Sequence, residues 1–113
     1  PYHQSQYCQI TSTSLLRQVL FKMTSATKPL IETLHLNKDL QVTMLGLNSG
    51  VSLSDHRTKV PAKLTVLSGS VIYNDVDGMT SLLRGDELAI PMNVKHSVQA
   101  TRRSICLLTR GAG

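Results

Sequence analysis

Short apolar runs, each ended by turn residues, follow one another through most of this 113-residue chain. Leu40, Val42 and Met44 alternate with Gln41 and Thr43, as expected for a strand with one buried and one wet face. Asp77 followed by Gly78 is a hairpin signal, because glycine takes positive φ without steric cost. We expect strands over residues 30–36, 40–47, 51–54, 62–68, 70–74, 79–84, 87–90, 96–101 and 104–109. Many short strands separated by Gly, Asn and Asp turns are typical of an all-β antiparallel sandwich or barrel.

The N-terminal part of the chain has a different pattern. Residues 1–13 are polar and show no apolar periodicity, so we interpret them as a tail. Apolar residues between positions 15 and 23 then recur at helical spacing, with Ser14 as the N-cap. An extended segment is the alternative, since residues 19–21 also suit a strand. The predicted organisation is an N-terminal arm, a short helix or an extended segment, over residues 1–27, and one β domain over residues 28–113.

Charge and cysteine content limit the classes of function. The 12 Lys and Arg against 7 Asp and Glu give a net charge of +5, but the basic residues are scattered and no aromatic residues interleave with them. Nucleic-acid binding is therefore not expected. No stretch of about 18 apolar residues is present, so no membrane span is expected. The two isolated cysteines, Cys8 and Cys106, do not form a disulfide framework, which favours a reduced, cytoplasmic setting.

Two stretches carry specific spacings of Gly, Pro and His. The first, residues 54–69, holds His56, Thr58 and Pro61 ahead of Gly69, and the second, residues 85–96, holds Gly85, Pro91, Asn93 and His96. These stretches resemble the two motifs of small single-domain cupins, the RmlC-like jelly-roll family, and the resemblance covers residues 28–110. It implies a double-stranded β-helix, an antiparallel jelly-roll barrel that often pairs as a homodimer.

The same resemblance implies a metal site made by a His-x-His pair, a Glu and a later His. His56 matches the first histidine and His96 the last, whereas Thr58 and Ala62 stand where the second histidine and the glutamate would be. Two imidazoles without a carboxylate leave the geometry and charge of a divalent ion under-determined. We therefore predict a degenerate metal site that binds, at most, a weakly held Ni, Mn, Fe or Zn ion.

Strand alternation predicts which side chains share the barrel interior. Leu64 and Val66 lie on the side of Ala62, and Val98 lies on the side of His96. The predicted pocket residues are His56, Thr58, Ala62, Leu64, His96 and Val98. A mostly apolar cavity with two imidazoles suits a small organic ligand that carries a polar or anionic group. The opposing interpretation is a barrel filled by its own side chains.

Three functions follow as hypotheses. The first is a small-ligand-binding cupin with a degenerate metal site. The alternative is a divalent-metal-dependent cupin enzyme of oxygenase, isomerase or lyase type. A third is a structural or sensory module that acts through its dimer surface. We expect a homodimer because residues 15–23 and 30–36 carry more apolar surface than one barrel covers. The fold alone identifies neither a substrate nor a catalytic residue.

Overall fold

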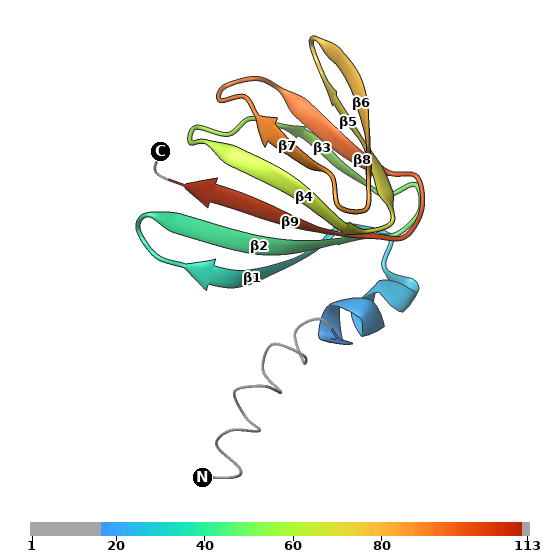
Figure 1. The fold of residues 1–113 in the computed structure, drawn as a ribbon. Coiled ribbons are helices and arrows are strands. Elements are labelled where there is room, and N and C mark those ends of the chain that lie inside the picture. Colours follow the sequence, from blue (N-terminus) through green and yellow to red (C-terminus); the bar gives the residue numbers. More distant parts are fainter. Residues whose placement is uncertain (1–16, 112–113) are drawn as a thin grey trace, which may run out of the picture.

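The computed structural model describes residues 17–111, except for the side chains of residues 54–56. Nine described strands dominate it (Figure 1). They are β1 (Leu30–Leu36), β2 (Leu40–Leu47), β3 (Ser52–His56), β4 (Ala62–Ser68), β5 (Ser70–Asp75), β6 (Gly78–Leu83), β7 (Glu87–Ile90), β8 (His96–Ala100) and β9 (Ser104–Gly111). Each expected strand is present, with bounds that differ by at most two residues.

The described strands form two antiparallel sheets that face each other (Figure 1). The larger sheet has the order β1-β2-β9-β4-β7, and the smaller one has the order β3-β8-β5-β6. Strands from distant parts of the chain are neighbours: β2 pairs with β9, and β3 pairs with β8. This connectivity is that of a jelly roll. The prediction of an all-β jelly-roll barrel is therefore confirmed.

The interior between the sheets is filled along most of its length. Leu47, Val66 and Cys106 are fully buried there, together with Val71 and other residues of the smaller sheet. Burial of these aliphatic side chains supplies the main stabilisation, at roughly 1.5–3 kcal/mol for each fully buried Val or Leu. The same burial raises the pKa of the Cys106 thiol to about 11, so this cysteine is an inert core residue at neutral pH.

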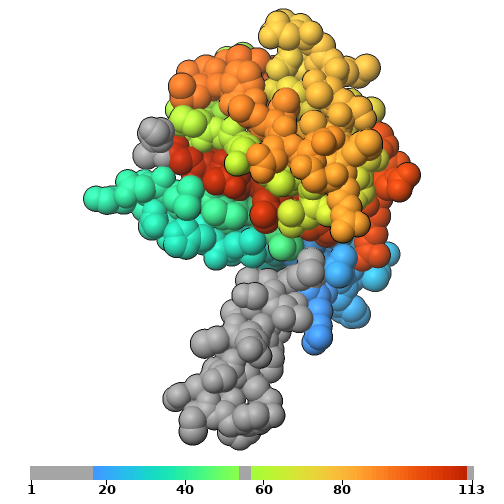
Figure 2. Space-filling model, viewed as in Figure 1, coloured from blue at the N-terminus to red at the C-terminus, as the bar shows by residue number. Residues whose placement is uncertain are grey.

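A short helical segment covers the outer face of the larger sheet. Residues 17–22 are α-helical and continue into a 3-10 turn, η1 (Met23–Ser25). Val19 and Met23 are buried there against Met44 and Ile105, which point away from the barrel interior. In Figure 2 this blue segment contacts the β-domain directly. The helix prediction is confirmed for these residues and the extended alternative is wrong, whereas Ser14 and the tail lie outside the described residues.

Close packing and hydrogen bonds fix the helical segment on the sheet. Gly46 of β2 allows the helical segment to approach closely, since a Cβ at this position would lie 2.7 Å from the sulfur of Met23. The side-chain amide of Asn48 donates to the carbonyls of Met23 and Ala26, and Arg103 donates to the carbonyl of Leu20 at 3.0 Å. The arm is thus attached to the barrel over its last turns.

Within residues 17–111, no helix is long and apolar enough to cross a membrane.

Candidate ligand pocket

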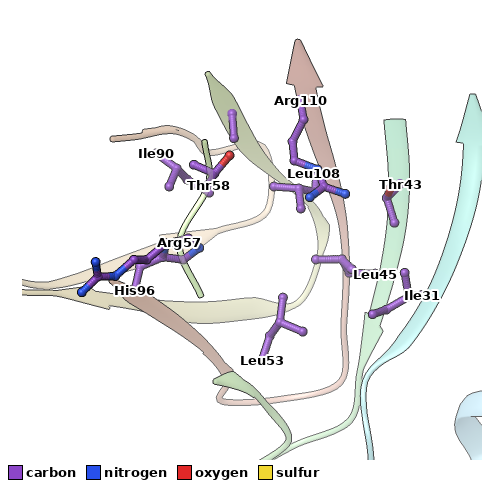
Figure 3. A pocket seen from close by; sticks show the side chains of 11 residues that line it. Ile31, Thr43, Leu45, Leu53, Arg57, Thr58, Ile90, His96, Leu108 and Arg110 are labelled. Atoms are coloured by element: carbon purple, nitrogen blue, oxygen red, sulfur yellow. The ribbon is translucent and has the colours of Figure 1, made fainter. Parts of the chain in front are cut away.

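A half-open cavity of about 190 Å³ lies between the two sheets, at the end where β4 begins and β9 ends. Its apolar lining consists of Ile31, Leu45, Leu53, Ala62, Ile90 and Leu108, and its polar lining consists of Thr43, Arg57, Thr58, His96 and Arg110. Figure 3 shows side chains of β2 and β9 on one side of the cavity and Thr58 and His96 on the other. Further along the same strands Leu47, Val66 and Cys106 fill the interior. The barrel is therefore open at one end and filled towards the other.

The predicted pocket residues do not all reach this cavity. Thr58, Ala62 and His96 line it, whereas Leu64 and Val98 are buried in the core beneath it and do not line it. The backbone of His56 pairs with that of His96 across β3 and β8. The side chain of His56 lies outside the described residues.

His96 is held from several sides. Its ring stacks on Tyr73, with ring centroids 5.7 Å apart, and its Nδ1 lies 3.2 Å from the carbonyl oxygen of Val94. The Tyr73 hydroxyl donates to Asp75 at 2.9 Å. Burial, together with this carboxylate, raises the pKa of Tyr73 to about 12, so the phenol stays neutral at physiological pH. The stacking on Tyr73 and the contact with Val94 hold the His96 ring in place at the cavity wall.

The other two motif positions offer little to a metal ion. The Thr58 hydroxyl donates to the Val60 carbonyl at 2.7 Å, and Ala62 has no donor atom. Across β4 and β9 the backbone of Ala62 pairs with that of Arg110, whose guanidinium bonds to Gln41 of β2, so this pairing supplies no carboxylate either. Among the described residues, no three His, Cys, Asp or Glu side chains gather as a metal-binding group. The described residues do not fit a metal centre.

Sequence reasoning missed three polar residues of this cavity: Thr43, Arg57 and Arg110. Arg110 follows Cys106 and Leu108 at alternate positions of β9, so the period of two, continued to the end of the strand, would have identified it. The alternation in β2 predicts Thr43 on the wet face, and this prediction is wrong, since Thr43 is 3% exposed and lines the cavity. Arg57 is exposed at the rim, across the cavity from Arg110 in Figure 3.

Comparison with known proteins supports the fold. No family model and no curated protein matches the sequence. A cupin superfamily protein from Desulfitobacterium hafniense has a TM-score of 0.72 and 19% identity, covering 75% of this chain and 78% of that one. An RmlC-like cupin from Shewanella frigidimarina has a TM-score of 0.71 and 18% identity, with 79% and 80% covered. A conserved protein of unknown function from Streptococcus pyogenes has a TM-score of 0.69 and 24% identity, with 75% of each chain covered.

The chain therefore has the fold of the small RmlC-like cupins, and the resemblance found in its motifs is confirmed at the level of the fold. At this level of identity the fold does not transfer an activity.

Proposed function

We propose that the protein binds a small organic ligand in the half-open cavity. The observation that carries this proposal is the composition of the lining: six apolar side chains with a few converging polar groups. Cavities of this kind are the usual small-molecule sites of proteins, in which the apolar wall supplies affinity and the polar groups set orientation. The volume of about 190 Å³ suits a ligand of one small ring, since an apolar cavity of about 150 Å³ holds benzene.

The filled part of the barrel supports such a site. Leu47, Val66 and Cys106 pack tightly behind the cavity, and the Tyr73 ring fixes His96 from the same side. Side chains held by packing keep a binding geometry without loss of entropy when a ligand arrives. The ligand thus enters a preformed site at the open end of the barrel.

Titration calorimetry with benzyl alcohol tests the proposal. We expect a dissociation constant on the order of 1 mM for a ligand of this size. Ala62→Leu fills the cavity and should abolish binding, whereas Ala89→Leu makes the same change at an exposed position of β7 and should leave it unaltered. Absence of binding to the wild type, or equal binding by both variants, would disprove a ligand site in this cavity.

The divalent-metal-dependent enzyme remains the alternative proposal, and it rests on His56 and His96 alone. We expect two imidazoles without a carboxylate to hold a Ni, Mn, Fe or Zn ion weakly, because none of the described lining residues of the cavity is acidic. In a calorimetric titration with metal we expect weak binding, with a dissociation constant in the millimolar range.

A homodimer and a cytoplasmic location complete the proposal. β1 is an edge strand with exposed apolar side chains, Ile31 and Leu36, and a second copy of the chain would cover them. Light scattering at micromolar concentration should give twice the monomer mass, and a monomer mass would refute the pairing.

The proposed cytoplasmic location is inferred from the isolated cysteines, of which Cys106 is free and buried.

A further inference from the structure

Two polar atoms in the cavity region are buried without a hydrogen-bond partner among the described residues: Oγ1 of Thr43 and Nε of Arg110. Both residues line the cavity, and Thr43 is only 3% exposed. Most buried polar groups in folded proteins are hydrogen-bonded, because leaving one unpaired is costly. These two atoms lack a partner among the described residues, and both belong to residues that a ligand in the cavity would contact.

The guanidinium of Arg110 is oriented by its neighbour. Its Nη2 donates to the side-chain oxygen of Gln41 at 2.8 Å, across the β2–β9 pair. Thr43 is the next inward-facing residue of β2 and lies opposite Leu108, diagonally across from Arg110. Diagonal neighbours on a sheet face are within reach of a long side chain. One ligand group between Thr43 and Arg110 can thus contact both.

The charge around the cavity favours an anion. Arg57 and Arg110 line it, and none of its described lining residues is acidic. The two ion pairs among the described residues, Glu32 with Lys22 and Glu87 with Lys63, involve no residue of the cavity lining. In the part of the chain that the structure describes, Arg110 has no carboxylate partner. An arginine in a partly apolar wall gains most from an anion that reaches it there, since screening by water is weak.

We infer that the ligand of this cavity is a small organic carboxylate, bound at Arg110 and Thr43 with its apolar body against Leu45 and Leu108. The inference rests on the proposed function and specifies its ligand class. A carboxylate presents two oxygens, which match one guanidinium edge and one hydroxyl donor. Inorganic phosphate has no hydrocarbon body to place against the six apolar residues of the lining, whereas an organic carboxylate has one.

Three probes of one shape test the inference: benzoate, benzyl alcohol and benzylamine. In titration calorimetry, benzoate should bind at least tenfold more tightly than benzyl alcohol, since hydrogen bonds to charged groups are the stronger ones. Benzylamine should bind more weakly than the alcohol, and inorganic phosphate should not compete with benzoate. If the alcohol binds and benzoate binds no better, the carboxylate inference is overturned while the ligand cavity stands. If none of the ring probes binds, the proposed function itself fails.

Variants identify the residues responsible. Arg110→Met should weaken benzoate binding about tenfold or more and change benzyl alcohol binding less than twofold. Arg84→Met removes the same charge from an exposed turn that lines neither described cavity and should change nothing. Thr43→Val keeps the side-chain shape and should weaken benzoate roughly threefold, which provides a second test should Arg110→Met fail to fold. Unchanged benzoate binding in folded Arg110→Met, or in Thr43→Val, refutes the assignment of that residue.

Discussion

Replacement of Gly69 by alanine should destabilise the fold far more than the same replacement at Gly85. Both glycines have positive φ, +86° and +90°, so both variants force an L side chain into a left-handed conformation. This costs about 1–2 kcal/mol, and the change in unfolded-state entropy is common to both. The comparison therefore isolates what surrounds the new methyl group.

The surroundings of the two glycines differ completely. Around Gly85 no heavy atom lies within 4 Å of a built Cβ, whereas at Gly69 the Cβ would collide with the carbonyl oxygen of Arg103 and lie 2.8 Å from the Cα of Ser104. These are backbone atoms and cannot rotate away. Ser104 is fully buried, and its hydroxyl accepts from the Ser70 amide at 3.0 Å, so a shift of this turn also weakens a buried hydrogen bond.

The extra cost at Gly69 follows from these contacts. Overpacking adds about 1–3 kcal/mol, and the disturbed hydrogen bond of Ser104 adds about 1 kcal/mol. We expect Gly69→Ala to lose about 2–4 kcal/mol more unfolding free energy than Gly85→Ala. This difference is a large part of the total stability of a small domain. Urea denaturation followed by far-ultraviolet circular dichroism measures both losses. Equal losses in the two variants would show that the β4–β5 turn does not approach Ser104 as closely as described.

Three further predictions concern the arm, the core and the metal site. Gly46→Leu should displace the helical segment from the sheet and make residues 17–25 sensitive to limited proteolysis, while the circular-dichroism spectrum of the barrel persists; an intact segment would contradict the packing on Met23. The pKa of Tyr73 is raised from 10.0 to about 12, so the folded state holds the phenol proton more tightly than the unfolded chain does. The contribution of this phenol to the free energy of unfolding is therefore fully present below pH 10 and is lost as the pH rises from 10 to 12. In denaturation experiments over this pH range, the unfolding free energy of Tyr73→Phe should fall less steeply with pH, by up to about 1.4 kcal/mol per pH unit. An unchanged slope would refute the raised pKa of Tyr73. Thr58→His combined with Ala62→Glu should strengthen Ni²⁺ binding roughly a hundredfold in calorimetric titration, and tight binding by the parent protein would disprove the degenerate site.

The strands and their turns could be predicted from the sequence because they depend on local chemistry. Asp77 and Gly78 bring two strand-forming runs together at a hairpin, and Gly85 ends the next strand with a positive φ. These signals act within a few residues, so the bounds of β4 to β9 were predicted to within two residues. The cupin-like spacing from residue 54 to residue 96 depends on the same turns, which explains why the fold class could also be inferred.

Tertiary structure alone decided which face of β2 looks into the barrel. Met44 and Leu45 are both buried, Met44 under the helical segment and Leu45 in the interior, so alternation of polarity does not reveal the inner face. The inner face follows from the pairing of β2 with β9, which lies about 60 residues away in the sequence. That pairing turns Thr43 and Arg110 towards one cavity. The sequence by itself determined the jelly roll, whereas long-range strand register determined the cationic pocket, because register sets the direction of every side chain on a strand.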